Sequence, residues 1–484
     1  MNGTTDGEEY SQPRIGNYLR ENKLEAEDNA RVYSRPAIPE KEGDGAKVGG
    51  LNQNAGKTRE SRVEEDLLEK ILSPDNLDAA YKQVKRNKGS HGVDGMTVEQ
   101  LLPYLLEHGK KLSESILGGT YKPQPVRRVE IPKPDGGIRL LGIPTVVDRV
   151  VQQAVAQVLM PIYEKKFSDS SYGFRPGRSA QQAIERSRTY INEGYTWTVD
   201  IDLEKYFDTV NQDKLMRILS REVKDGRVIS LIRKFLVSGV MINGVIMETE
   251  EGLAQGGNIS PLLSNIMLHE LDSELEKRGL RFCRYADDCN IYVKSKKSAE
   301  RIMKSITRFI EEDLKLKVNQ NKSTVDRPWK LKFLGFSFYY NHKRSEYVLR
   351  VHEKPIKKFM AKLKELTSRS NGMSMDLRLL KLKQAIYGWV NYFRVADMGI
   401  LAKNLDKWVR RRMRMVIWKT WKRVRTRFKS LRKLGLDKSQ AWQFANTRKG
   451  YWRISGSPIL ATTITNKILE KRGLASISAV YLKR

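Results

Sequence analysis

Two short acidic segments of this otherwise basic chain could together form a metal site. The first, Thr198–Val210, contains Asp200 and Asp202, and the second is the tetrapeptide Tyr285-Ala-Asp-Asp288 between two short apolar runs. Adjacent side chains on a straight strand face opposite sides, but at a hairpin tip both carboxylates can turn toward one cleft. Three carboxylates that met there would repel one another unless cations neutralised them. The segments therefore predict a site for a hard cation such as Mg²⁺.

The chemistry of such a site is the transfer of a nucleotidyl group. Two Mg²⁺ ions, roughly 3.5–4 Å apart, can activate an attacking 3′-hydroxyl and stabilise a departing pyrophosphate. An Asp-Asp dipeptide by itself is more often a solvated hairpin turn. The flanking apolar strands and the second acidic strand end together favour the metal site over that simpler interpretation.

The elements that must position these carboxylates form a mixed α/β region. Residues 127–141 read as two short strands around a Pro-Asp-Gly-Gly turn. Thr145 then begins a helix, with Asp148 completing a capping box. Strands and helices alternate to about Phe338, whereas residues before this region, from about Val63, have helical spacing.

Composition limits what kind of protein this is. The chain has 484 residues, a formal net charge of +32 and 39% hydrophobic residues. That surplus of positive charge predicts a polyanionic partner. Neither a membrane span nor a signal peptide is evident, and two cysteines, Cys283 and Cys289, exclude a disulfide framework and a four-cysteine zinc site. Residues 1–61 are polar and are expected to be a disordered leader.

The most basic segment, Lys407–Lys433, is predicted to be helical and to bind nucleic acid. It contains thirteen Lys or Arg residues and no acid. A buried stripe is expected from residues spaced by three or four, with Trp418 either in the core or stacked on bases. That stripe comprises Val409, Met413, Ile417, Trp421 and Val424.

The cations around this stripe are the predicted phosphate contacts, although a solvated basic face is the plainer alternative. Arg411, Arg412 and Arg414 lie outside the stripe, so neutralising them is expected to weaken RNA binding without unfolding the protein. The predicted contacts are Arg410, Arg411, Arg412, Arg414, Lys419, Lys422 and Arg423.

Several blocks in this order resemble one family, the reverse transcriptase/maturases encoded by group II introns. Tyr285–Asp288 is similar to the signature of reverse transcriptases. The similarity extends from about residue 62 over nearly all the rest of the chain. The other blocks that carry it are Ile131–Arg139, Ser171–Arg178, Asp202–Asp208, Gln255–Pro261 and Leu334–Phe336.

The resemblance implies an α/β right-hand polymerase, with fingers and an antiparallel palm sheet, followed by an α-helical thumb. Residues 62–125 would form an N-terminal extension and the start of the fingers, and residues 126–345 the fingers and palm. Residues 346–455 would form the thumb, or maturase domain X. Residues 456–484 would be a short tail, a reduced DNA-binding segment at most, with no HNH endonuclease.

Residue roles also follow from the resemblance. The family places the catalytic aspartate five residues before an aromatic that faces the sugar, and counting back from Phe207 gives Asp202. Asp200 would then be a supporting or surface carboxylate. With Asp287 and Asp288, Asp202 would hold two Mg²⁺ ions.

The nucleotide would contact a second group of residues. Lys133 and Arg139 would hold the triphosphate, and Gln255 would hydrogen-bond near the ribose. Phe207 would exclude a 2′-hydroxyl. Leu253-Ala254 stands where the family usually has Thr-Pro, a change that is expected to adjust a turn.

The expected activity is RNA-directed DNA polymerisation, combined with binding of intron RNA as a splicing maturase. The partners would be group II intron RNA, an RNA template with a DNA primer, deoxynucleoside triphosphates and target DNA, in a bacterial cytoplasm. Two alternatives remain open at this point. One is a domesticated reverse transcriptase that acts in repair or defence, and the other is a splicing cofactor without polymerase activity.

Overall fold

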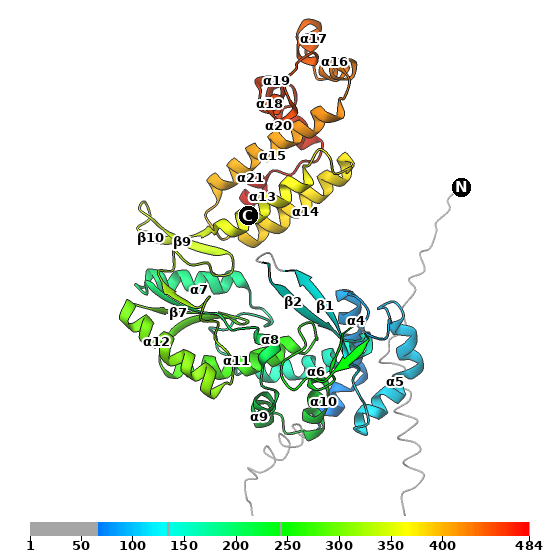
Figure 1. Ribbon diagram of the computed structural model, residues 1–484, viewed down its shortest axis with the longest axis vertical. Helices are drawn as coiled ribbons and strands as arrows, with labels where there is room; N and C mark the ends of the chain where they lie inside the picture. Colours follow the sequence, from blue (N-terminus) through cyan, green and yellow to red (C-terminus); the bar gives the residue numbers. More distant parts are fainter. Residues whose placement is uncertain (1–65, 133–135, 243, 484) are drawn as a thin grey trace, which may run out of the picture. The chain divides into compact units, whose positions relative to one another are not determined.

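The computed structural model describes residues 66–132, 136–242 and 244–483 in two compact units (Figure 1). Unit 1 comprises the described residues up to Ser179, together with Val199–Ile291 and Glu300–Thr324. Unit 2 comprises Ala180–Thr198, Tyr292–Ala299 and the described residues from Val325. The expected leader, residues 1–61, lies outside the described residues.

Unit 1 begins with helices whose apolar faces pack together. They are α3 (Leu67–Ile71), α4 (Pro74–Asn87), α5 (Leu101–Leu117) and α6 (Val146–Glu164). The buried face of α4 consists of Leu77, Ala80, Tyr81 and Val84, as its helical spacing predicts. The predicted cap of α6 is confirmed, because the Thr145 hydroxyl accepts a hydrogen bond from the amide of Asp148.

A four-stranded sheet follows in unit 1, in the order β2-β1-β4-β5. Strands β1 (Val126–Pro132) and β2 (Ile138–Ile143) are antiparallel, with Arg127 opposite Ile143 and Pro132 opposite Ile138. This is the strand pair that the Pro-Asp-Gly-Gly turn predicts. Strand β4 (Val240–Ile242) runs parallel to β1 and antiparallel to β5 (Val245–Met247).

The acidic segments belong to a second sheet, in the order β6-β7-β3-β8. Its strands are β3 (Trp197–Ile201), β6 (Arg281–Tyr285), β7 (Asp288–Val293) and β8 (Thr324–Asp326). The helices between its strands are α8 (Tyr206–Thr209), α9 (Gln212–Glu222), α10 (Gly226–Leu236), α11 (Ser260–Lys277), α12 (Lys296–Arg308) and the π-helix η1 (Phe309–Asp313). Helix α11 is buried along most of its length, so it forms the core of unit 1.

Unit 2 contains α7 (Ala180–Asn192), a hairpin and a set of helices. The hairpin pairs β9 (Phe336–Asn341) with β10 (Glu346–Val351). Three longer helices, α13 (Glu353–Leu366), α14 (Met375–Phe393) and α15 (Gly399–Thr420), follow. The remaining helices are α16 (Val424–Lys433), α17 (Lys438–Ala445), α18 (Tyr451–Ser455), α19 (Pro458–Thr463), α20 (Asn466–Lys471) and α21 (Ile477–Leu482).

One expectation about unit 2 is corrected. The basic segment is two helices, because α15 ends at Thr420 and α16 begins at Val424. The side chain of Val424 is therefore 37% exposed instead of continuing the buried stripe. The C-terminal residues are a set of short helices, and α18 and α21 pack against α15 (Figure 1). Among the described helices, none has both the length and the apolar character needed to cross a membrane.

Candidate active site and nucleic-acid surface

The Tyr285–Asp288 tetrapeptide forms the tip of the β6–β7 hairpin. Strand β6 ends at Tyr285 and β7 begins at Asp288, so the connecting turn is two residues long. Ala286 has a φ of 58°, a backbone conformation that residues with a Cβ seldom adopt. Two-residue hairpin turns require positive φ at one or both central residues, which explains why Ala286 is in this region. The predicted hairpin with adjacent aspartates at its tip is confirmed.

Asp202 and Asp288 share one face of the sheet. The side chains of Asp200 on β3 and Asn290 on the neighbouring β7 are joined by a hydrogen bond of 3.1 Å, so they share a face. Residues two apart on an extended chain also share a face. The chain stays extended past Asp202, since Leu203 forms a β-bridge with Val318. It follows that Asp202, Asp200, Asn290 and Asp288 line the same face.

The backbone of Asp202 is held at the end of β3 by the loop before β8. Its amide donates to the Ser323 hydroxyl at 3.0 Å, and its carbonyl accepts from the amide of Asn319 at 2.8 Å. The Nζ of Lys322 lies 3.8 Å from Oδ2 of Asp202, whose side chain is 43% exposed. Lys322 was not among the predicted site residues, since nothing in its spacing from Asp202 indicates the contact.

The three predicted metal ligands are all carboxylates, but their side chains are not grouped as a metal site. All three are hard oxygen donors, which suits Mg²⁺. In the described ranges, however, no three His, Cys, Asp or Glu side chains are grouped so that they could hold a metal ion as they stand. The two-ion site at Asp202, Asp287 and Asp288 therefore stays a prediction.

A buried ion pair, which no sequence motif indicated, lies directly behind the hairpin. The guanidinium of Arg284 on β6 contacts the carboxylate of Asp272 on α11 at 2.5 Å, and both side chains have no exposed surface. Burial by itself would lower the pKa of Arg284, but the charge and hydrogen bonds of Asp272 outweigh it and hold that pKa above its usual value. Cys283 and Cys289, on either side of the turn, are buried free thiols.

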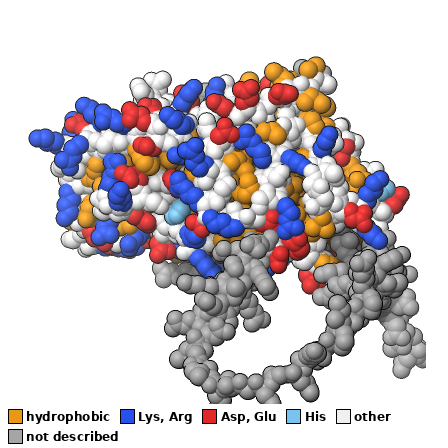
Figure 2. Space-filling model, turned by 90° about the horizontal axis from the view of Figure 1, so that it is seen from below, with side chains coloured by type: hydrophobic (Ala, Val, Ile, Leu, Met, Phe, Trp, Pro, Cys, Tyr) orange, Lys and Arg blue, Asp and Glu red, His pale blue; other side chains and the backbone are white. Residues whose placement is uncertain are grey.

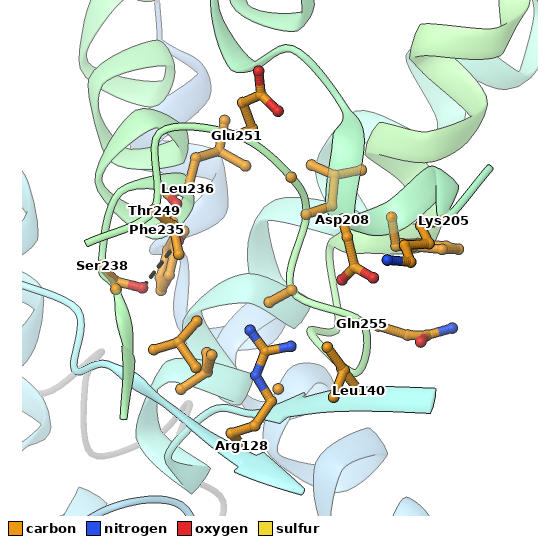
Figure 3. A pocket seen from close by; sticks show the side chains of 18 residues that line it. Arg128, Leu140, Lys205, Asp208, Phe235, Leu236, Ser238, Thr249, Glu251 and Gln255 are labelled. Atoms are coloured by element: carbon orange, nitrogen blue, oxygen red, sulfur yellow. Dashed lines mark hydrogen bonds between the residues drawn. The ribbon is translucent and has the colours of Figure 1, made fainter. Parts of the chain in front are cut away.

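Phe207 and Gln255 meet in one pocket of about 240 Å³ (Figure 3). Lys205, with a φ of 45°, turns the chain into α8 and precedes Phe207 by two residues. The carbonyl of Phe207 accepts a hydrogen bond from the amide of Leu253 at 2.6 Å. The Leu253 amide thus anchors the backbone of Phe207, and the expected adjustment of this turn stays a prediction.

Charged side chains line the same pocket. Figure 3 shows the guanidinium of Arg128 pointing into it from β1, with Lys205, Asp208 and Gln255 around it. The carbonyl of Gln255 accepts from the amide of Gly142 on β2 at 2.9 Å, which ties the Gln255 segment to the first sheet. The pocket has room for part of a polar ligand and is bordered by two of the predicted nucleotide-binding residues.

The structure describes only one of the two predicted triphosphate ligands. Arg139 is exposed on β2, opposite Ile131 of β1. Lys133 lies outside the described residues, so the structure does not test its position. Both roles stay predictions.

The arginines of α15 mostly bind the protein itself. Arg414 is only 9% exposed, and it donates to the Ile464 carbonyl and the Asn466 side chain, both at 2.9 Å. Arg412 donates to the Thr367 hydroxyl at 2.5 Å. Burial lowers the pKa of both arginines, which shows that they are partly withdrawn from water.

Two further cations of α15 have partners in the C-terminal helices. The guanidinium of Arg411 lies 4.0 Å from the centre of the Trp452 ring. Arg410 lies 3.5 Å from the Glu470 carboxylate. The premise that Arg411, Arg412 and Arg414 all lie outside the core is thus wrong for Arg414, and its loss would leave the buried Ile464 carbonyl without a donor.

The tryptophans of the basic segment have different environments. Trp418 is 1% exposed and belongs to the core, whereas Trp421, at the break between α15 and α16, is only half-buried. The open alternative for Trp418 is therefore decided in favour of packing. The predicted stripe holds for Val409, Met413 and Ile417, which are all buried.

Much of the exposed positive charge of this region lies on α16 and just before it. Arg425, Lys429 and Lys433 are exposed and spaced by four residues, so they share one face of α16. Trp442 on α17 is 58% exposed, with its ring edge-on to Phe428 at 5.8 Å. Lys422 and Arg423, two of the predicted contacts, are exposed beside α16, whereas Lys419 donates to the Arg369 carbonyl.

On the face of the molecule that Figure 2 shows, positive charge is not spread evenly. Figure 2 shows a face on which Lys and Arg side chains gather at the left, while acidic and apolar side chains are interspersed over the remainder. A net charge of +32 therefore does not by itself locate a binding surface. A binding surface has to be located from the local arrangement of exposed cations.

Two segments of the chain match known families. The family of reverse transcriptases (RNA-dependent DNA polymerases) matches residues 131–338, and the maturase-specific domain of group II introns matches residues 356–435. Protein YkfC of Escherichia coli is 36% identical over 299 residues, which is 54% of this chain and 78% of YkfC.

Two further relatives carry intron-related names. The group II intron-encoded protein LtrA of Lactococcus lactis is 38% identical over 219 residues, 45% of this chain and 36% of LtrA. Nuclear intron maturase 2 of Arabidopsis thaliana is 31% identical over 177 residues, 28% of this chain and 24% of that protein. The matched region thus spans most of YkfC but only about a third or less of these two longer relatives.

Proposed function

Since this chain belongs to the reverse transcriptases that carry a group II intron maturase-specific domain, we propose that its β3 and β6–β7 carboxylates catalyse RNA-directed DNA synthesis and that its helical unit binds intron RNA. The observation that carries the catalytic part is the shared face of Asp202 and Asp288. In this proposal the β6-β7-β3-β8 sheet is the palm, the β1–β2 hairpin belongs to the fingers, and the helices from α13 form the thumb.

Each site residue has a role in the proposed reaction. Asp202, Asp287 and Asp288 would hold two Mg²⁺ ions, which supply activation of the primer 3′-hydroxyl and charge neutralisation at the triphosphate. Arg139 and Lys133 would bind the triphosphate as counter-charges. Phe207 would pack against the 2′ carbon of the incoming sugar, and Gln255 would hydrogen-bond beside it. The pocket that contains Phe207 and Gln255 supports this assignment.

The positions of exposed positive charge and of the carboxylates suggest where each nucleic acid would bind. The exposed row of Arg425, Lys429 and Lys433 would contact phosphates of intron RNA, and Trp442 would stack on an unpaired base. We assign template RNA with its DNA primer to the carboxylate face. Target DNA would bind the C-terminal helices as part of intron mobility.

Primer extension on an RNA template with deoxynucleoside triphosphates tests the polymerase. Asp288→Asn should lower extension by several orders of magnitude and leave the affinity for RNA nearly unchanged, because the metal site loses one charge while the phosphate-binding surface is elsewhere. Asp213→Asn is the matched control, since the Asp213 side chain is 83% exposed. Near-parent extension by Asp288→Asn would contradict the assignment.

A splicing assay on the same variants tests the division of labour. If the RNA performs the splicing chemistry, Asp288→Asn should support splicing as well as the parent does. An inactive parent polymerase that still promotes splicing would instead favour a splicing cofactor without polymerase activity.

A further inference from the structure

The β6–β7 turn that carries two of the proposed metal ligands needs support from outside. Ala286 adopts a φ of 58°, and holding a non-glycine residue there costs about 1–3 kcal/mol. Such a conformation persists only when the surroundings fix it. Two residues of the turn region, Asp287 and Asp288, are the proposed ligands, so whatever fixes Ala286 also fixes their position.

Arg284 supplies a direct contact to this turn. One of its terminal nitrogens, Nη1, donates to the Ala286 carbonyl at 2.8 Å and to the Asn265 side chain at 3.1 Å. The Nε and Nη2 atoms donate to the two carboxylate oxygens of Asp272 at 2.7 and 2.5 Å, and Nη2 also donates to the Ser171 hydroxyl at 2.8 Å. These five hydrogen bonds match the five N–H groups of a guanidinium, so the side chain is held in one orientation.

The block Ser171–Arg178, which has no role in the proposed reaction, forms the other side of this support. The amide of Tyr172 donates to the Arg284 carbonyl at 2.9 Å, and the amide of Arg284 donates to the Ser170 carbonyl at 2.8 Å. A Cβ on Gly173 would lie 2.2 Å from the Ala286 nitrogen. The backbone of Gly173 therefore touches the turn, and only glycine fits there.

Stability is a poor explanation for this arrangement. A fully buried ion pair contributes little net stability, and apolar residues of similar volume are often as stable or more so. An apolar pair at positions 272 and 284 could not, however, donate a hydrogen bond to the Ala286 carbonyl. What the ion pair uniquely provides is an oriented donor at the turn.

We propose that Arg284, oriented by Asp272, is a positioning residue that fixes the Ala286 turn and thereby places Asp287 and Asp288 for catalysis. This inference rests on the proposed polymerase function. Arg284 and Asp272 would act through the turn, without contact to the substrate or the reacting atoms.

The decisive variant replaces the pair by apolar residues. Arg284→Met with Asp272→Leu removes the buried pair without leaving either charge unpaired, and it should leave the affinity for template-primer unchanged. Its kcat for primer extension should nevertheless fall by about 10- to 100-fold, the scale expected for misplaced reacting groups. A kcat equal to that of the parent in this double variant would show that the pair is merely structural.

A second variant covers the case in which the double variant does not fold. Arg284→Lys keeps a charge opposite Asp272, but one ammonium cannot reproduce the planar fork that reaches both Asp272 and the Ala286 carbonyl. It should show the same decrease in kcat. Parent-like kcat in Arg284→Lys would overturn the proposal.

Hydrogen exchange provides a readout that does not need activity. Peptides that cover β6 and β7 should exchange faster at the turn in both variants, without metal or nucleic acid. The control is Asp225→Ala, which removes a buried cap that accepts from the Leu68 amide at 3.0 Å. It should lower the melting temperature and leave exchange at the turn unchanged.

The two hypotheses fail differently. A parent protein that does not extend a primer on an RNA template would refute the proposed function. Hydrogen exchange at the β6–β7 turn would still test whether Arg284 fixes that turn. An active parent whose turn exchanges at the same rate as in the Arg284 variants would refute the positioning role alone.

Discussion

The β6–β7 hairpin and helix α15 both depend on buried arginines, but sequence motifs described only the hairpin correctly. At the hairpin, Arg284 is fully buried and holds a turn whose aspartates remain at the surface side of the sheet. On α15, Arg414 is buried against the C-terminal helices, where phosphate contact had been predicted. The comparison teaches that an arginine in a basic run has to be placed in three dimensions before it is assigned to RNA.

The largest expected effect distinguishes Asp200 on β3 from Asp202 just after it. Asp202→Ala should abolish measurable primer extension, because the proposed metal site loses a ligand. Asp200→Ala should be much milder, since Asp200 bonds to Asn290 within the sheet. Steady-state kinetics of both variants decide the assignment, and the reverse order would move the catalytic role to Asp200.

A stability measurement tests the other half of the comparison. Arg414→Ala should lower the free energy of unfolding of unit 2 by about 2–3 kcal/mol, because it leaves the buried Ile464 carbonyl unpaired and removes a packed side chain. Lys422→Ala, at an exposed position, should change it by no more than about 0.5 kcal/mol. Denaturant titrations that gave equal stabilities for these two variants would contradict the structural role of Arg414.

Sugar selection is the next effect in size. Phe207→Ala should open space beside the 2′ carbon and raise the use of ribonucleotides relative to deoxynucleotides by about 10- to 100-fold. The measurement is the ratio of kcat/KM values for matched nucleotide pairs. An unchanged ratio in an active variant would leave Phe207 with only a packing role in the pocket.

The smallest expected effect concerns salt. Replacing Arg425, Lys429 and Lys433 by Gln should flatten the slope of log affinity against log salt by up to roughly 0.7–0.9 for each phosphate that the protein no longer neutralises. Replacing the exposed Lys110 and Lys111 of α5 is the control. A slope that stays at the parent value would exclude this face of α16 as the RNA surface.

The sequence alone was sufficient for the family, the acidic segments and much of the local structure. Hairpin tips, helix caps and apolar spacing depend on neighbours within a few residues, so the β6–β7 turn, the Thr145 cap and the buried residues Val409, Met413 and Ile417 were all predictable. Motif order identified the reverse transcriptase and maturase domains for the same reason, because each block is a local pattern.

Only the tertiary structure decided which charged side chains face inward. Arg284 and Asp272 are twelve residues apart, and their pairing also requires Ser171 from a distant segment. Arg414 finds its partners fifty residues further along the chain, at Ile464. An arginine can be buried only where distant elements of the fold supply hydrogen-bond acceptors for it. The spacing of residues within one helix cannot predict where those acceptors lie.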